Sequence, residues 1–312
     1  MTDFAMLALD PNVQWILFGS LLLGLCSGVI GSFAYLRKQS LMGDALSHAA
    51  LPGVCLAFLI TGSKSIFGFL AGAAIAGVAA TVGIGLLTRY SRIKPDSAIA
   101  AVLSVFFGFG LMLLTEIQHS GSGNQSGLDK FLFGQAASMV ASDVYTMVIV
   151  SIGLLTVCSL LFKEFKLLSF DPGFARGLGY PVAILDQLMM LLIVIAVVAG
   201  IQAVGVVLMA ALLITPAVSA RYWTDRLGVM IALAGLFGAL SGAIGTLISA
   251  SGNNLPTGPL SVLCATALFV FSVVFAPRRG LIGKLRTRAE ARKALLAVAQ
   301  TAAVTQGKGE AI

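Results

Sequence analysis

The stretch VAILDQLMMLLIVIAVVAGIQAVGVVLMAALLITPAV, from Val182 to Val218, decides the fold class because it is apolar almost throughout. A run of about 18 or more apolar residues with few charges predicts a helix that crosses a membrane, and this run is long enough for two. Its weakest points are Gly200, Gln202 and Gly205. The stretch therefore forms either a tight helical hairpin or one long broken helix, and the sequence leaves both open.

The composition of the whole chain agrees with a membrane protein. Of the 312 residues, 58% are hydrophobic and 11% are charged, whereas about a quarter of the residues in a soluble domain are charged. The 35 Gly and 9 Pro residues fit the same class, because membrane helices tolerate both residue types. This composition excludes an ordinary soluble protein and leaves no room for a separate soluble catalytic domain.

Apolar runs recur along the chain and give the predicted architecture. They cover Val13–Leu36, Leu41–Thr61, Ile66–Leu87, Ala98–Leu114, Val144–Phe162, Val182–Ile201, Val204–Val218, Gly228–Ala250 and Leu260–Ala276. We predict an all-α polytopic membrane protein, a bundle of eight or nine transmembrane helices. The number depends on how the stretch that begins at Val182 folds.

The charges predict the orientation. The net charge is +7, which in a membrane protein is a topology signal more often than a nucleic-acid footprint, and we expect no nucleic acid as partner. If the N-terminus is outside and nine helices cross, 18 of the 20 Lys and Arg residues fall in cytoplasmic connections, and Lys64 and Lys130 do not. We predict an outer tail over residues 1–12, a transmembrane domain over 13–279 and a basic cytoplasmic tail over 280–312.

The clearest candidate for chemistry is GDALSHAALPG, from Gly43 to Gly53. Asp44 and His48 stand four residues apart and therefore share one face of a helix. Carboxylate oxygen and imidazole nitrogen suit divalent Mn, Fe or Zn, but two ligands do not complete a metal site, so a second copy of the chain or a paralogue would supply more. Alternatively, Asp44 caps the helix and His48 only packs. A simple topology places the pair in the cytoplasmic half of the membrane.

Weaker metal candidates are Glu116, His119 and Asp129, in or near the segment that joins the fourth and fifth apolar runs. We expect this segment, residues 115–142, to be an outer loop whose apolar part, Phe131–Gly134, forms a short re-entrant or interfacial helix. A solvated pair is the simpler interpretation of Glu116 and His119, and capping is an equal alternative for Asp129.

A second informative segment is FDPGFARGLGYPV, from Phe170 to Val182. Asp171 is a typical N-cap, Pro172 suits the first helical position, and Gly179 suits the C-terminal end. A helix of under two turns is not stable alone in water. We therefore expect it to dock, either on a partner or on the cytoplasmic face of its own chain.

Two further acidic residues lie next to basic ones. We expect Asp186 to pair with Arg176 or to reach the membrane interface, since long side chains near helix ends extend toward water. We expect Asp225 to form a cytoplasmic ion-pair cluster with Arg221 and Arg226.

The chain has none of the sequence patterns of the common enzyme classes. It contains no G-x-x-x-x-G-K-[ST], no H-E-x-x-H and no G-x-S-x-G motif, and its four cysteines lie inside apolar runs. We predict that it is not an enzyme, binds no covalent cofactor and does not bind ATP by a P-loop. A channel or secondary transporter for a divalent cation, working without an ATPase, is the rival class. The scarcity of intramembrane carboxylates disfavours it.

Five separate blocks in this order make the chain resemble the transmembrane permeases of ABC importers for manganese, zinc and iron. The blocks are Ser32–Leu59, Leu128–Gly134, Phe170–Val182, Gly205–Leu227 and Asn254–Leu263. The resemblance implies a permease in a bacterial cytoplasmic membrane that pairs with a second permease, recruits two cytoplasmic ATPase subunits and receives metal from an extracytoplasmic binding protein.

The resemblance also implies roles for particular residues. Asp44 and His48 match the family's GDALSH block and would be ligands of the transported metal. The short helix would be the coupling helix that sits in a groove of the ATPase, with the residues Asp171, Pro172, Gly173, Phe174, Ala175, Arg176, Gly177 and Gly179. Relatives often carry Glu where this chain has Gly173, which removes one salt bridge to the ATPase.

Overall fold

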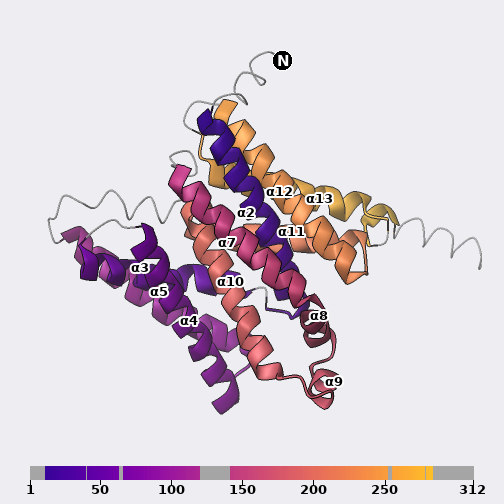
Figure 1. Ribbon diagram of the computed structural model, residues 1–312, viewed down its shortest axis with the longest axis horizontal. Helices are drawn as coiled ribbons and strands as arrows, with labels where there is room; N and C mark the ends of the chain where they lie inside the picture. Colours follow the sequence, from indigo (N-terminus) through magenta and orange to yellow (C-terminus); the bar gives the residue numbers. More distant parts are fainter. Residues whose placement is uncertain are drawn as a thin grey trace, which may run out of the picture.

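The computed structural model describes residues 11–39, 41–62, 66–119, 141–251, 255–277 and 279–283. Within these ranges the chain is helical and has no strand, which confirms the predicted all-α class (Figure 1). The helices are α2 (Pro11–Leu36), α3 (Leu41–Thr61), α4 (Ile66–Tyr90), α5 (Pro95–His119), α7 (Ala141–Leu160), α8 (Phe162–Phe170), α9 (Pro172–Gly177), α10 (Val182–Val204), α11 (Val206–Trp223), α12 (Leu227–Ser251) and α13 (Thr257–Phe275).

The helices form two groups that meet at α10. Helices α3, α4 and α5 lie together on one side, and α2, α11, α12 and α13 lie together on the other (Figure 1). Helix α10 packs against both groups, α11 also contacts α3, and α7 packs on α2 and α10. Helices α8 and α9 project at the end of the bundle opposite the start of α2. Seven of the described helices are long and apolar enough to cross a membrane, and α7 with α8 would make eight. Helix α11, with 18 residues, covers the predicted crossing over Val204–Val218 but is not among these candidates.

The α7–α8 pair differs from the expected straight crossing over Val144–Phe162. The two helices meet at Leu161 with a bend of 67°. Helix α8 buries Phe165 and Leu168, and it carries two lysines and a glutamate. Charged side chains favour the water-exposed end of a bundle, so the helix turns along the protein's surface at this end and does not continue α7.

The stretch that decided the fold class is a tight hairpin. Helix α10 ends at Gly205, which has φ 90° and ψ 162°, and α11 begins at the next residue. A Cβ atom added to Gly200 would overlap the side chain of Met209. Residues nine apart in one straight helix are about 13 Å apart, so this contact requires α11 to fold back on α10.

Small residues bring α2 and α12 into backbone contact. A Cβ atom added to Gly24 would overlap the carbonyl of Gly238, and one added to Gly238 would overlap the carbonyl of Gly24. Near one end of this seam the Ser20 and Thr246 hydroxyls share a 2.7 Å hydrogen bond. Such close approach is typical of membrane helix pairs, which associate by van der Waals contact and hydrogen bonds because lipid offers no hydrophobic driving force.

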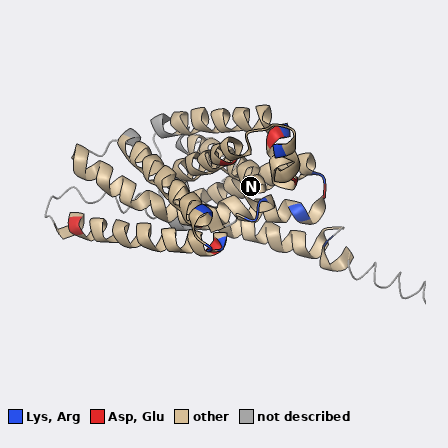
Figure 2. Cartoon of the chain, turned by 90° about the horizontal axis from the view of Figure 1, so that it is seen from below, with Lys and Arg blue, Asp and Glu red and all other residues tan. Residues whose placement is uncertain are grey.

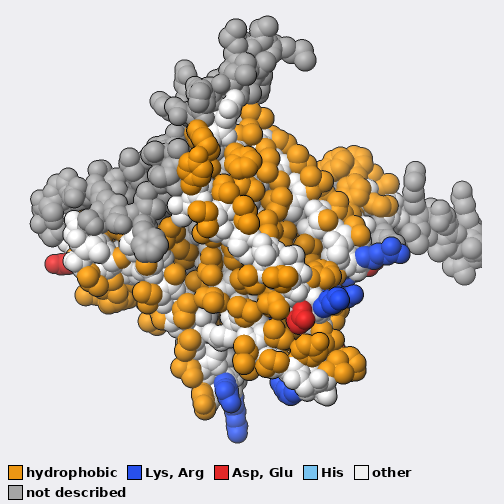
Figure 3. Space-filling model, in the orientation of Figure 1, with side chains coloured by type: hydrophobic (Ala, Val, Ile, Leu, Met, Phe, Trp, Pro, Cys, Tyr) orange, Lys and Arg blue, Asp and Glu red, His pale blue; other side chains and the backbone are white. Residues whose placement is uncertain are grey.

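Charge is absent from most of each helix and gathers near the helix ends (Figure 2). The face seen in Figure 3 is covered by hydrophobic side chains, with Lys and Arg at its lower and right-hand edges. This distribution is that of a protein whose middle is surrounded by lipid. Residues 1–10 of the predicted N-terminal tail, the re-entrant segment and Asp129, and most of the C-terminal tail lie outside the described residues.

Candidate functional site

Asp44 and His48 lie in the first turns of α3 and face each other. His48 Nε2 is 3.5 Å from Asp44 Oδ1, and the two side chains are 20% and 45% exposed, respectively. This distance is longer than the usual 2.9 Å of an N–H···O hydrogen bond. Two ligand atoms about 2.1 Å from one metal ion at a tetrahedral angle lie about 3.4 Å apart. The pair therefore has the spacing of two ligands on a single ion.

The His48 ring is held by α5. It packs edge-on against Phe107, with ring centroids 4.7 Å apart. Phe107 stands at the middle of α5, which runs from Pro95 to His119. His48 thus lies beside the middle of α5, and Asp44 lies one turn nearer the start of α3.

Two features of α3 leave polar atoms of His48 unpaired. Its Nδ1 is buried and has no hydrogen-bond partner among the residues that the structure describes. Pro52 lies inside α3 and has no N–H to donate to the carbonyl of His48, four residues earlier. An ionisable residue inside a membrane helix is a candidate for a functional site, because its burial is costly.

The described part of the chain brings two candidate metal ligands together at this point and no more. No group of three or more His, Cys, Asp or Glu residues that could hold a metal ion occurs among the described residues. A divalent transition metal takes four to six ligands. A complete site therefore needs groups from a second chain or water.

The weaker metal candidates do not join this pair. Helix α5 extends to His119, so the predicted loop start at Thr115 was wrong. The Thr115 hydroxyl donates to Leu111 O at 2.8 Å, and His119 Nδ1 lies 2.8 Å from Thr115 O, so these side chains return to the helix and prolong it. Glu116 and His119 are exposed. Glu116, the nearer of the two, lies about 13 Å beyond Phe107 along the axis of α5.

Helix α9 has the caps that the sequence predicted. The Asp171 carboxylate accepts a 2.9 Å hydrogen bond from the N–H of Phe174, and Pro172 is at the start of the helix. At the other end Gly179 has φ 85°. Its N–H donates to Arg176 O, and the N–H of Tyr180 donates to Ala175 O, both at 3.1 Å. These two bonds form a Schellman motif, so a six-residue helix is closed at both ends.

One face of α9 is covered by the protein and the other is not. Ala175 is 1% exposed, whereas Phe174 and Leu178 are each 57% exposed. Helix α9 lies beside α8 at the end of the bundle (Figure 1). The helix therefore docks on its own chain through Ala175 and presents apolar side chains outward.

Asp186 pairs with a different arginine from the expected one. It forms an ion pair with Arg37, the residue after α2, in place of Arg176. The same guanidinium nitrogen lies 3.8 Å from Met189 Sδ. The Arg37 side chain is 14% exposed and that of Asp186 36%, so water screens this pair only in part.

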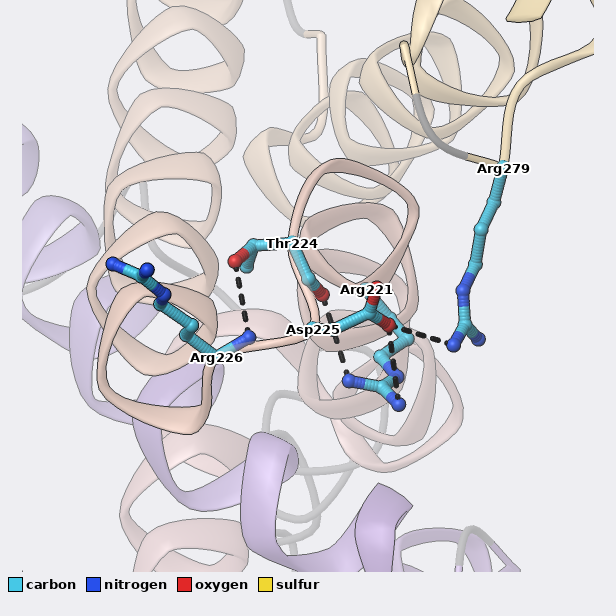
Figure 4. A network of polar contacts seen from close by, with 5 residues as sticks. All are labelled: Arg221, Thr224, Asp225, Arg226 and Arg279. Carbon is cyan, nitrogen blue, oxygen red and sulfur yellow. Dashed lines mark hydrogen bonds and ion pairs between the residues drawn. The ribbon is translucent and has the colours of Figure 1, made fainter.

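A second ion-pair cluster joins the α11–α12 connection to the end of α13 (Figure 4). Asp225 lies 3.5 Å from Arg221 and 2.7 Å from Arg279. The cluster was predicted with Arg226, whose side chain points away from Asp225 in Figure 4. Arg226 contributes its backbone N–H, which donates to the Thr224 hydroxyl at 3.1 Å.

Sequence reasoning missed Phe107 and Arg37. Phe107 lies within an apolar run, where an aromatic residue carries no sign of a functional neighbour. Arg37 was assigned to a cytoplasmic connection by its charge alone, and its partner is 149 residues away. No local pattern identifies either contact.

Comparison with known proteins gives the same picture over most of the chain. The chain is 57% identical over 294 residues to the manganese transport system membrane protein MntC of Bacillus subtilis (strain 168), covering 92% of this chain and 68% of the relative. It is 45% identical over 279 residues to the zinc transport system membrane protein TroC of Treponema pallidum (strain Nichols), covering 89% and 94%.

A solved structure, that of PsaBC from Streptococcus pneumoniae in complex with Fab, superimposes with a TM-score of 0.78 at 32% identity and covers 89% of this chain and 97% of that chain. The profile of the ABC 3 transport family matches residues 10–276. The chain therefore belongs to the ABC 3 transport family.

Proposed function

We propose that this chain is the permease subunit of an ABC importer for a divalent transition metal, manganese or zinc, with iron also compatible with the donor atoms. The relatives named for manganese and zinc transport support the substrate class. The observation that carries the proposal is the Asp44–His48 pair, 3.5 Å apart on a spanning helix. One hard oxygen and one borderline nitrogen match these metals.

The partners follow from what the chain lacks. Two ligands from one chain leave the coordination shell of the ion incomplete, and a second permease facing this one would supply two more. The sequence has no P-loop, so ATP hydrolysis belongs to two cytoplasmic ATPase subunits. A binding protein outside the membrane delivers the metal.

Helix α9 is the proposed coupling helix. Its exposed Phe174 and Leu178 suit an apolar groove on the ATPase, and its capped ends keep it helical when it moves. Gly173 has only hydrogen as its side chain and makes no salt bridge there, so the contact rests on shape and apolar surface.

The proposed mechanism is alternating access driven by the ATPase subunits. Movement of α9 tilts the permease helices and exposes Asp44 and His48 first to one side of the membrane and then to the other. The N-terminus is outside and the C-terminus cytoplasmic, since this orientation places 18 of the 20 basic residues inside.

Metal accumulation in cells that lack their own importers tests the metal site. The chain is co-expressed with its genomic neighbours as wild type, Asp44→Ala or His48→Ala, and each metal is measured by elemental analysis. We expect wild type to accumulate one divalent metal. Accumulation of that metal should be at least about tenfold lower in both variants, because each variant removes one bond to the metal. Asp225→Ala, whose carboxylate is 44% exposed, and His119→Ala are matched controls that retain uptake. Wild-type accumulation by both site variants would contradict the site.

Co-purification tests the ATPase partner and the rival ATPase-independent channel. The ATPase should co-purify with the wild-type permease and be lost when residues 171–179 are replaced by a flexible linker. Uptake that needs no ATP and survives the linker would support the channel and overturn the importer proposal.

A further inference from the structure

Both helices that flank α9 contact the last turn of α2. Helix α8 precedes α9, and its Phe165 packs edge-on against Phe33 of α2 with centroids 5.6 Å apart. Helix α10 follows α9, and its Asp186 forms the ion pair with Arg37. Phe33 and Phe165 are fully buried. A displacement of α9 therefore reaches the same turn of α2 by two routes.

The connection from α2 to α3 is closed by hydrogen bonds. Lys38 has φ 57°, its N–H donates to Tyr35 O, and the N–H of Gln39 donates to Ala34 O, both at 3.0 Å. This is a Schellman motif with lysine in the left-handed position, which a non-glycine residue adopts rarely. Met42 at the start of α3 then donates to Gln39 O at 3.0 Å. The end of α2 and the start of α3 thus form one hydrogen-bonded unit.

The start of α3 is also the part that carries Asp44. Arg37 and Asp44 are seven positions apart in the sequence. A Cβ atom added to Gly43 would lie 2.8 Å from Leu213 Cδ2 of α11, so little space is available for this end of α3 to move independently of its neighbours. A shift at Arg37 is therefore transmitted to the metal ligand.

The exposure of the ion pair distinguishes it from an ordinary surface pair. Arg37 is 14% exposed, whereas in the Arg279–Asp225 pair the side chains are 47% and 44% exposed. Screening by water and salt makes exposed pairs nearly neutral in energy, and partial burial preserves more of the attraction. The less exposed pair is the one that joins α10 to α2.

We propose that the Arg37–Asp186 ion pair is the positioning link by which movement of α9 and α10 reaches the Asp44–His48 pair. This inference rests on the proposed function, with α9 as coupling helix and Asp44 and His48 as ligands. Arg37 and Asp186 touch no metal in it. They set the position of α3 and so make metal release follow ATP hydrolysis.

The test measures how many ATP molecules are hydrolysed for each metal ion imported. The complete transporter, with its ATPase and binding protein, is reconstituted in vesicles as wild type, Arg37→Gln, Asp186→Asn and the neutral double variant. If the link carries the motion, ATP hydrolysis continues and the ratio of ATP to metal rises at least about fivefold, the lower end of typical coupling between sites. A merely structural role would lower both rates together and leave the ratio unchanged.

The neutral double variant keeps the proposal falsifiable if single variants fail to assemble, because it leaves no lone charge behind. The exchange of Arg37→Asp with Asp186→Arg should restore part of the coupling, while Arg279→Ala, which removes a pair on another connection, should keep the wild-type ratio. A wild-type ratio in the neutral double variant would overturn the link.

Failure of the link and failure of the proposed function give different results. If only the link is wrong, uptake stays dependent on ATP and on residues 171–179, with an unchanged ratio in the Arg37 and Asp186 variants. If the proposed function is wrong, the wild-type protein itself imports metal without ATP.

Discussion

The position of the His48 ring depends on one aromatic neighbour. Phe107 contacts the ring edge-on at 4.7 Å and is itself 38% exposed. Aromatic pairs of this kind contribute about 0.5–1.5 kcal/mol beyond their buried area. We expect Phe107→Ala to release the ring and to raise the metal concentration for half-maximal uptake about two- to tenfold.

The control for this prediction is Phe109→Ala. Phe109 lies two residues further along α5, is 47% exposed, and faces the lateral groove that also includes Leu56 and Ile75. Uptake measured against metal concentration should be unchanged in this variant. Equal curves for Phe107→Ala and wild type would show that the ring needs no support from α5.

The Gly24–Gly238 contact predicts a large cost for a small side chain. A Cβ atom at either position meets backbone, which has no rotamer by which to move aside. We expect Gly238→Ala to lower the stability of the protein by about 1–3 kcal/mol, as overpacking does elsewhere, seen as a lower Tm in detergent. Gly85→Ala is the matched control, because Gly85 lies within α4 and has nothing within 4 Å of an added Cβ. Equal Tm values for the two variants would contradict the close backbone contact between α2 and α12.

At the residue scale, the sequence predicted what is local and missed what is distant. Asp44 and His48 are four residues apart, and helical periodicity alone puts them on one face. Arg37 and Asp186 meet only because α2 and α10 pack together, and nothing near either residue encodes that choice. Charge proximity in sequence pointed to Arg176, which lies beyond the N-cap of α10.

Among the elements, α9 depends most on Gly179, the glycine two residues beyond its last helical residue. Gly179 closes the Schellman motif with φ 85°, a conformation that a β-branched residue adopts only with strain. We expect Gly179→Val to unwind α9, to reduce the ATPase that co-purifies and to lower metal uptake severalfold.

Gly62→Val is the control for this variant. Gly62 follows α3 and has φ 59° with open space around it, so valine imposes comparable backbone strain far from α9. Co-purified ATPase should stay at the wild-type amount. An equal loss of co-purified ATPase in both variants would indicate a general folding defect and not a specific effect on α9.

The boundaries of the helices show which of them can be predicted from the local sequence. Those of α9 were predictable, because caps are set by the residues within one turn. The bend between α7 and α8 was not, since apolar residues continue through Phe162. The end of α5 at His119 was missed because side-chain bonds back to the helix, as from Thr115, do not alter the hydropathy pattern.

Orientation in the membrane is a property of the whole molecule, and cysteine labelling tests it. The four native cysteines are buried and should give little background, because a maleimide needs an exposed thiol. We expect a membrane-impermeant maleimide to label Ser122→Cys, in the segment between α5 and α7, in intact cells. Ser91→Cys, between α4 and α5, should react only after the cells are permeabilised.

The two variants serve as controls for each other, since both replace serine outside the predicted spans. If only Ser91→Cys were labelled in intact cells, the orientation would be opposite to the proposed one. At this scale the sequence predicted the class well, because composition and hydropathy are sums over many residues. The packing of α3–α5 beside α10 and α11 had to be seen in the structure.

The seam between α2 and α12 has a consequence for how the chain tolerates change. Positions such as Gly24 and Gly238 have no room for any side chain. Ile60, in contrast, is 82% exposed, so another apolar side chain could replace it and still contact lipid. In a saturation library selected for metal-dependent growth, the smallest residues should be the least replaceable and many of the largest should be freely exchanged. As the sequence diverges during evolution, its large lipid-facing residues should therefore change first, and the glycines of this seam should be retained.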